Sequence, residues 1–213
     1  MQPLSPLFAR PWIRHAPWWL MMALASATSL ASARYLAGGE TMIPPPLVPN
    51  FIDHPTAFYF HIGAASVALL LGPWQFLGSL RRAQPTLHRV MGMFYVAACF
   101  VGGAAAFPIE LGSNGGPVAA AGFMTLAALW FVTTSSAVAA ILSGNRDAHR
   151  RWMIRSFSLT LAGVTLRLYL PIALLGPVSF SPGYAAIAWL CWLPNLLIAD
   201  RVGDYFAQRA AAS

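Results

Sequence analysis

Two histidine–arginine pairs have the residue types and placement to bind a cofactor. His88–Arg89 lies in "QPTLHRVMGMFY" and His149–Arg150 lies in "NRDAHRRWMIRSF", and each pair stands at the start of an apolar stretch. Imidazole is a common axial ligand of haem iron, and guanidinium groups pair well with carboxylates such as haem propionates. If the two stretches are neighbouring helices, both histidines would stand at one level and could hold one haem b between them.

The residues around the first pair agree with this hypothesis without requiring it. Gly92 follows His88 by one helical turn, which would leave room for a flat macrocycle beside the imidazole. In the structural alternative, each histidine caps its helix or meets lipid headgroups. A quinone or another small ligand is a third interpretation.

His61 is a further candidate because it lies inside an apolar stretch. An ionisable residue within a membrane span is a functional candidate by default. Met124 is expected at a comparable depth on another helix, and a His/Met pair also ligates haem. The alternatives are ordinary ones: a neutral histidine hydrogen-bonded to the helices around it, and a methionine that fills space.

Arg167 is the residue whose burial would cost most. It is expected roughly 22 Å along its helix from the cytoplasmic end, and arginine at mid-span costs about 2.5–3.5 kcal/mol on insertion scales. It therefore needs a partner, and Glu110 is the nearest acid by depth, ahead of Asp53 and Glu40. The alternative is that its long side chain reaches the outer headgroups.

Composition identifies the elements that must position these side chains. The 213-residue chain is 58% hydrophobic and 9% charged, whereas soluble domains carry about 25% charged residues. Apolar stretches of membrane-spanning length, roughly 20 residues, recur along it. We therefore predict an all-α polytopic membrane helix bundle that forms a single integral membrane domain, residues 1–213. The six predicted transmembrane helices are Pro17–Ala37, Ala57–Gly78, Arg89–Pro108, Pro117–Leu142, Trp152–Leu175 and Gly183–Ala199.

The arginines predict the orientation of the bundle. All 13 basic residues are arginine, and 11 of them lie before the first helix, in or beside the second and fourth links, or after the last helix. The positive-inside rule then places both termini of this multi-pass protein in the cytoplasm. The net charge of +7 also predicts attraction to anionic lipid at the cytoplasmic face. Nucleic-acid binding is not expected.

The first helix has an alternative interpretation as a signal peptide. Basic residues, an apolar core and "SLASA" before Arg34 resemble such a segment with a small-residue cleavage site. Its apolar stretch is long for that role, so we expect a retained helix. Cleavage would leave the orientation of the other five helices unchanged.

The inner links resemble each other and predict a four-helix core. Helices two and three, and helices four and five, form hairpins of the same orientation, each with a His-Arg pair on its outgoing helix, as in a parallel internal repeat. Helical spacing aligns His88, Gly92, Tyr95, Cys99 and Gly102 on one face of helix three. It likewise aligns residues on helix five: His149, Ser156, Thr160, Gly163 and Arg167. Because small and polar residues in membrane helices face other helices, we expect both faces to share the interior of helices two to five.

Motifs of soluble enzymes are missing from the sequence. It has no phosphate-binding glycine-rich loop, no GxSxG turn and no HExxH pattern. Its two cysteines, Cys99 and Cys191, are expected to be small buried hydrophobes. Whether the protein is an enzyme is therefore uncertain. A redox role within the membrane is one hypothesis, and a hydrolytic site that uses Arg167 and His61 is a more distant one.

Three motifs resemble a bacterial family of predicted membrane proteins, domain of unknown function number 2306. They are "HIGAASVALLLGPWQF", "PTLHRVMGMFY" and "HRRWMIRSFSLTLAGVTLRLYLP", and the resemblance covers about residues 58–171. It implies a membrane protein and no particular activity. More distantly, the four-helix core is similar to di-haem cytochromes that carry electrons from ascorbate across membranes. Those proteins have histidines on all four core helices, whereas helix four here has none, so a second haem is not expected.

Two functions follow as hypotheses. In the first, the protein binds haem b through His88 and His149 and transfers electrons to or from a quinone or another redox partner. In the second, it is a non-redox membrane protein, an assembly factor or a small-solute permease, whose polar interior is structural or binds a solute. A permease is expected to have helices broken near the midplane. Pro73 and Pro171 are candidates for such breaks, but each lies near a helix end, which weakens the permease hypothesis.

Overall fold

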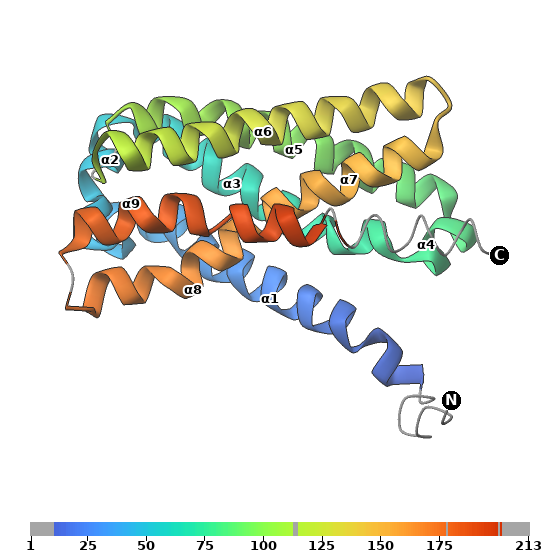
Figure 1. Cartoon of the computed structure of the whole chain (residues 1–213), viewed down its shortest axis with the longest axis horizontal. Coiled ribbons are helices and arrows are strands. Elements are labelled where there is room, and N and C mark those ends of the chain that lie inside the picture. Colours follow the sequence, from blue (N-terminus) through green and yellow to red (C-terminus); the bar gives the residue numbers. More distant parts are fainter. Residues whose placement is uncertain (1–10, 113–114, 178, 200, 202–213) are drawn as a thin grey trace.

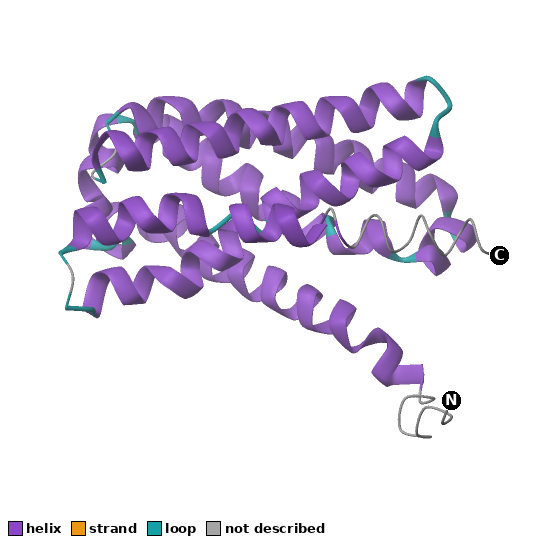
Figure 2. Ribbon diagram, in the orientation of Figure 1, coloured by secondary structure: helices purple, strands orange, loops and turns teal. Residues whose placement is uncertain are grey.

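The computed structural model describes residues 11–112, 115–177, 179–199 and 201. The chain termini, Arg10 and Arg209, on which the orientation prediction partly depends, lie outside the described residues. The described residues form helices joined by short links and turns, and they include no strand (Figure 2). This confirms the all-α prediction.

The helices follow one another closely along the chain (Figure 1). Their bounds are α1 (Pro11–Gly38), α2 (Val48–Asp53), α3 (Pro55–Leu71), α4 (Gly78–Ala83), α5 (Pro85–Leu111), α6 (Gly116–Leu142), α7 (Arg146–Thr160), α8 (Ala162–Leu175) and α9 (Phe180–Leu190). Three short 3₁₀ segments are η2 (Gly39–Met42), η3 (Pro45–Leu47) and η4 (Pro73–Phe76).

Five helical stretches among the described residues are long and apolar enough to cross a membrane. They are Pro55–Phe76, Pro85–Leu111, Gly116–Leu142, Arg146–Leu175 and Phe180–Ala199. Helix α1, the first of the six predicted spans, has 28 residues but is not one of these five. The multi-pass architecture is therefore confirmed for five spans, and a sixth crossing by α1 stays a prediction.

Packing follows the chain order through the first part of the bundle. Helix α3 packs on α5, α5 on α6, and α6 on α7, while α1 lies against α3. Helix α8 turns away from this group and packs on α9 and α1, and α9 covers α6 (Figure 1). The predicted core of helices two to five is therefore not confirmed, because α8, the outer half of the fifth predicted helix, packs with α1 and α9.

The fifth predicted helix is interrupted at Leu161, where α7 ends and α8 begins in a new direction (Figure 1). The N–H of Val164 donates to the Leu161 carbonyl at 2.9 Å, which is the tighter 3₁₀ pattern. The hydroxyl of Thr165 donates to the same carbonyl at 3.3 Å. Neither proline nor glycine stands at the interruption itself, so composition gave no signal of it.

The last span has a second interruption, at Cys191–Trp192, before helix resumes over 193–199. There the indole N–H of Trp192 donates to the carbonyl of Ala188 at 2.8 Å. The amide of Asn195 donates to the carbonyl of Cys191 at 3.0 Å. Side chains thus bind backbone carbonyls at both interruptions, as the interior of a membrane requires.

The link between the first two predicted helices is rich in proline and yet largely helical. Residues 39–53 form η2, η3 and the short helix α2. Prolines occupy the first turns of η3 and α2, where the missing N–H costs no helical hydrogen bond. Proline therefore starts helices here and does not break them.

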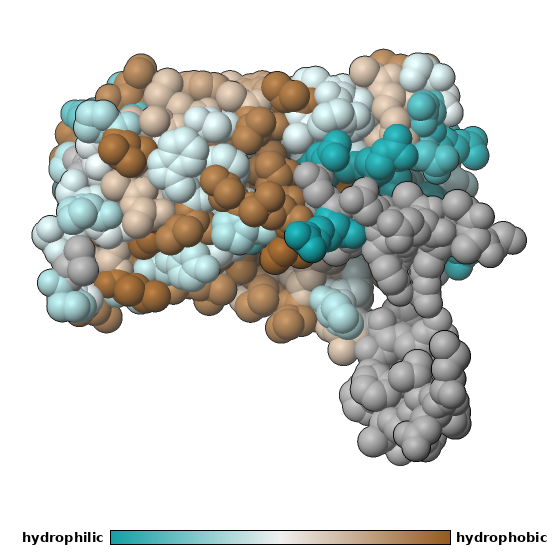
Figure 3. All heavy atoms as spheres, viewed as in Figure 1, coloured by the Kyte–Doolittle hydropathy of each residue, from teal (hydrophilic) through white to brown (hydrophobic). Residues whose placement is uncertain are grey.

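The two ends of the bundle differ in polarity. The α6–α7 turn and α4 lie at one end, while α2 and the α8–α9 turn lie at the other (Figure 1). Hydrophilic residues gather at the first end, beside a broad apolar band (Figure 3). The exposed arginines of that end are Arg81, Arg82, Arg89, Arg146, Arg150 and Arg151. Both inner links therefore meet at one end of the bundle.

Candidate functional site

His88 and His149 have the same position in their helices. Each is the fourth residue, of α5 and of α7 respectively. Each donates its backbone N–H to the residue before the helix, His88 to Gln84 and His149 to Asn145, both at 3.0 Å. The two imidazoles are also close enough to interact electrostatically. The predicted equivalence of the two His-Arg pairs is present in the fold.

The hydrogen bond of His149 determines which nitrogen remains available. Its Nδ1 lies 2.8 Å from the carbonyl oxygen of Ala137 on α6. A carbonyl only accepts, so Nδ1 carries the hydrogen and Nε2 of the neutral ring keeps its lone pair. A ring held in this way resembles the histidine ligands of metals, which donate their other N–H to an oriented acceptor. By contrast, Nδ1 of His88 is buried and has no hydrogen-bond partner among the described residues.

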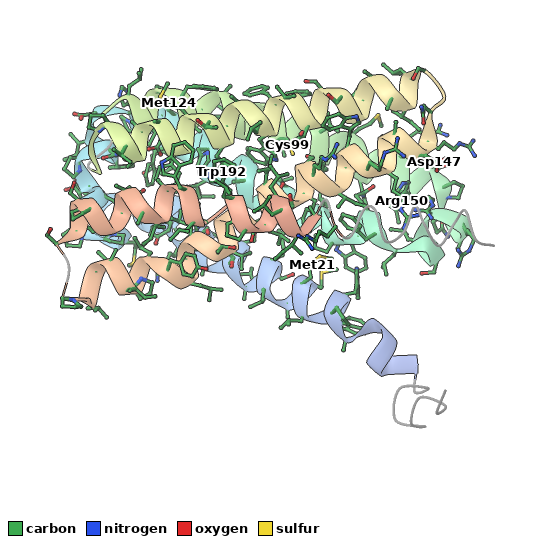
Figure 4. The ribbon with its side chains drawn as sticks, viewed as in Figure 1. Met21, Cys99, Met124, Asp147, Arg150 and Trp192 are labelled. Carbon is green, nitrogen blue, oxygen red and sulfur yellow. The ribbon has the colours of Figure 1, made fainter. Side chains whose placement is uncertain are left out.

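The space beside Gly92, where room for a macrocycle was expected, is occupied by another side chain. A Cβ added at Gly92 would lie 3.3 Å from Oε1 of Gln75, a residue of η4. The side chain of Gln75 therefore occupies the room expected for a macrocycle. Arg89 and Arg150 are exposed at the same end of the bundle, and Figure 4 shows Arg150 there beside Asp147. Among the described residues, no three His, Cys, Asp or Glu side chains gather to hold a metal ion. Bis-histidine haem needs only two protein ligands, so this absence does not bear on it. The position of Gln75 beside Gly92 does, because it leaves no room there for the porphyrin.

A cluster of buried hydroxyl groups lies deeper between the same helices. The hydroxyl of Tyr95 lies 3.0 Å from Oγ of Ser156 and 2.9 Å from Oγ1 of Thr160. Thr134 on α6 approaches the same Ser156 oxygen at 2.8 Å, and the indole N–H of Trp130 donates to Thr160 at 3.0 Å. All five side chains are at most 6% exposed. We call these five residues the hydroxyl cluster.

The hydroxyl cluster confirms the two predicted helix faces. Tyr95 and Cys99 of α5 face Ser156 and Thr160 of α7, as the helical spacing predicted, and Cys99 lies inside the bundle (Figure 4). Trp130 and Thr134 complete the cluster from α6 and were not identified in the sequence. Each hydroxyl can both donate and accept, so the cluster satisfies the polar groups of three helices at once.

A cavity of about 190 Å³ lies on the outer side of this cluster. Thr160 and Trp130 belong to both, so the two features are continuous. Apolar side chains form most of its wall, and both helix interruptions border it, through Ala162 and Cys191. The polar and charged residues of the wall are Ser32, Tyr35, Asn50, His61, Ser66, Glu110, Trp130, Thr160, Arg167 and Tyr184.

His61 lines this cavity from α3. Its Nδ1 lies 2.9 Å from the carbonyl oxygen of Gly102 on α5, so by the argument used for His149 its Nε2 is an acceptor in the neutral ring. Met124, the partner considered from sequence, does not line the cavity. Its neighbours Phe123 and Leu126 do line it, so Met124 is at the depth of the cavity but on another side of α6.

Arg167 enters the same cavity from α8. Its Nη1 donates to the carbonyl of Gly163 at 3.1 Å, one turn back along the helix. Within the described part of the chain, no carboxylate oxygen lies within 4.0 Å of the guanidinium. Glu110, the expected partner, also lines the cavity. The prediction therefore placed both residues in one space, but no direct ion pair joins them.

Two further wall residues have polar atoms without partners. Asn50 is 5% exposed, and its Nδ2 donates to the carbonyl of Ile109 at 3.3 Å, while its Oδ1 is buried without a hydrogen bond. Ser66 is 9% exposed, and its Oγ is also buried without one. An unsatisfied buried polar atom costs about 1–3 kcal/mol. Such atoms facing a cavity indicate a bound water or ligand.

Sequence reasoning missed most of this wall. Asn50 lies in the proline-rich link between the first two predicted helices, where no site residue was predicted. Tyr35 and Tyr184 are ordinary aromatic residues of apolar helices. Only the cost of burying Arg167 and His61 pointed to the right region. The predicted site residues thus divide between two places, with His88, Gly92 and His149 at the inner end and His61 and Arg167 at the cavity.

A comparison with protein-family models identifies the family of the chain. The model described as "Predicted membrane protein (DUF2306)" matches residues 58–202, which is more than half of the chain. No curated protein and no solved structure matches the chain.

Proposed function

The chain belongs to the DUF2306 family of predicted membrane proteins, and from this premise we propose that it binds a small solute in the cavity and moves it into or through the membrane. This is the non-redox alternative of the two hypotheses above. The observation that carries it is the cavity wall, where Arg167 has no carboxylate within 4.0 Å in the described chain.

The interrupted helices support this proposal. In many secondary transporters, discontinuous helices place backbone and side-chain groups around a solute at mid-membrane. Here the interruptions at Leu161 and Cys191–Trp192 both lie beside the cavity. Helices interrupted in this way can change direction with little loss of hydrogen bonding.

The proposal can be tested by thiol labelling. Asn50→Cys, in a chain with Cys191→Ser, should react with a membrane-impermeant maleimide from one side of sealed vesicles, since a solute must enter from water. Native Cys99, which is 1% exposed, is the internal control and should not react. If Asn50→Cys and Ser66→Cys both resist labelling from either side, the cavity does not receive a water-soluble solute and the proposal is wrong.

Haem b held by His88 and His149 is the second candidate. The orientation of His149 by the Ala137 carbonyl favours it, because Nε2 is left available as a ligand. Bound haem would supply one-electron transfer. A quinone is a suitable redox partner because it dissolves in the membrane. It requires Gln75 to leave the space beside Gly92.

The orientation in the membrane is also a proposal. Arginines exposed at the end that carries α4 and the α6–α7 turn support a cytoplasmic location for that end. They likewise support contact with anionic lipid there. A bacterial inner membrane with both termini in the cytoplasm remains our expectation for the whole chain.

A further inference from the structure

We infer that the solute of the cavity is a small organic carboxylate that also carries a hydroxyl or amino donor. This inference rests on the proposed function and specifies its substrate class. It is drawn from three features of the wall: the guanidinium of Arg167, the unsatisfied atoms of Asn50 and Ser66, and the size of the space.

Arg167 supports the carboxylate. Guanidinium binds carboxylates through two parallel hydrogen bonds, the strongest pairing available to it. Among the described residues, one of its five donors has a protein acceptor, the carbonyl of Gly163. Glu110 belongs to the same wall, so a ligand carboxylate is expected to bind at the guanidinium itself and to be held there by its hydrogen bonds.

Asn50 and Ser66 support the second group of the ligand. The amide orientation of Asn50 is defined by its bond to the Ile109 carbonyl, so the atom left over is an acceptor, Oδ1. It needs a donor, which a plain carboxylate lacks and a hydroxyl or amino group supplies. Nε2 of His61 is a second acceptor of the same wall. The hydroxyl of Ser66 can serve either group.

The volume limits the size of the ligand. The cavity of about 190 Å³ is below the 300–1,000 Å³ typical of sites for drug-sized molecules. It is slightly larger than an engineered cavity of about 150 Å³ that accepts benzene. One six-membered ring, or a short aliphatic acid, therefore fills it.

The test compares matched probes on the purified full-length protein in nanodiscs. The probes are 4-hydroxybenzoate, benzoate and 4-hydroxybenzamide, with lactate, propionate and lactamide as a smaller series. Binding is measured by titration calorimetry and by the rise in unfolding temperature that a ligand produces. We expect the hydroxy acid of at least one series to bind best, and its amide to bind tenfold or more weakly.

Variants separate the charge of the site from its size. Arg167→Gln should remove the preference for acid over amide, and Arg167→Lys should keep part of it. Ala127→Leu, at a wall residue that is 2% exposed, should weaken acid and amide alike by filling the space. Arg151→Gln, an exposed arginine outside the wall, is the matched control and should change nothing.

The outcomes distinguish the two proposals. If acid and amide bind equally, or if Arg167→Gln leaves the preference intact, the carboxylate inference is wrong while solute binding stands. If benzoate binds as well as 4-hydroxybenzoate, and propionate as well as lactate, the inference that the ligand carries a hydroxyl or amino donor is wrong. If no probe of either series binds although Asn50→Cys is labelled, the carboxylate class is overturned. If labelling also fails, so does the proposed function.

Discussion

Asn195 and Thr165 join the two interrupted helices to each other. Nδ2 of Asn195 donates to Oγ1 of Thr165 at 3.0 Å, and the same amide donates to the carbonyl of Cys191. Thr165 in turn donates to the carbonyl of Leu161. A single pair of side chains thus binds backbone carbonyls at both interruptions and connects α8 with the segment after α9.

Replacing Asn195 should therefore destabilise the protein more than replacing Thr165. Asn195→Leu removes bonds to both Thr165 and Cys191, at about 1–3 kcal/mol for groups left unsatisfied. Thr165→Val should cost about 1 kcal/mol. Unfolding in mixed micelles measures both, and the double variant should show a coupling energy of about 0.5–1.5 kcal/mol.

Ser143→Ala is the control for this pair, because Ser143 is exposed and bonds only within its own turn. It should be nearly neutral. Additive effects of the Asn195 and Thr165 substitutions would show that the two interruptions are independent.

The hydroxyl cluster should depend most on Ser156. Its oxygen is within hydrogen-bond distance of both Tyr95 and Thr134 and is fully buried. Ser156→Ala removes a shared partner, so we expect a loss of about 1–3 kcal/mol in the free energy of unfolding. Ser158→Ala is the matched control, since Ser158 bonds only to the carbonyl of Arg155 three residues back. Equal losses for the two variants would mean that the cluster adds nothing beyond ordinary packing.

Composition and helical spacing predicted the parts of the fold that depend on them alone. Five long apolar helices and the meeting of α5 and α7 through Tyr95 and Ser156 follow from hydrophobicity and a 3.6-residue period. The common position of His88 and His149 follows from the similar links before them. These features need no knowledge of how one helix packs against another.

The features that sequence reasoning missed depend on packing between helices. The interruption at Leu161 has no helix-breaking residue, and its carbonyl is bound by Thr165, which Asn195 contacts from the last span. The room expected at Gly92 is occupied by Gln75 of the preceding 3₁₀ segment. A glycine in a membrane helix indicates a close approach, but it does not identify what approaches.

The positions of the links give a prediction about topology. Reporter enzymes fused after Gly144 and after Ser213 should be active only as cytoplasmic reporters, because arginines flank the α6–α7 turn that contains Gly144. A fusion after Gly176, at the other end of the bundle, should be active only as a periplasmic reporter. An epitope at Met1 decides whether α1 crosses the membrane. Cytoplasmic Met1 means six spans, whereas periplasmic Met1 means five. A periplasmic reporter active at Gly144 would overturn the orientation.

The haem hypothesis predicts a spectrum that depends on both histidines. Protein purified from haem-replete cells should show a Soret band that sharpens on reduction with dithionite. His88→Ala and His149→Ala should each abolish the low-spin spectrum, because a bis-ligated iron loses that state when either ligand is removed. His54→Ala, between α2 and α3 at the opposite end of the bundle from the pair, is the control and should leave the spectrum unchanged. Gln75→Ala should raise haem content, since it frees the space beside Gly92. Haem-free protein in all of these preparations would remove this candidate and leave the solute cavity as the functional site.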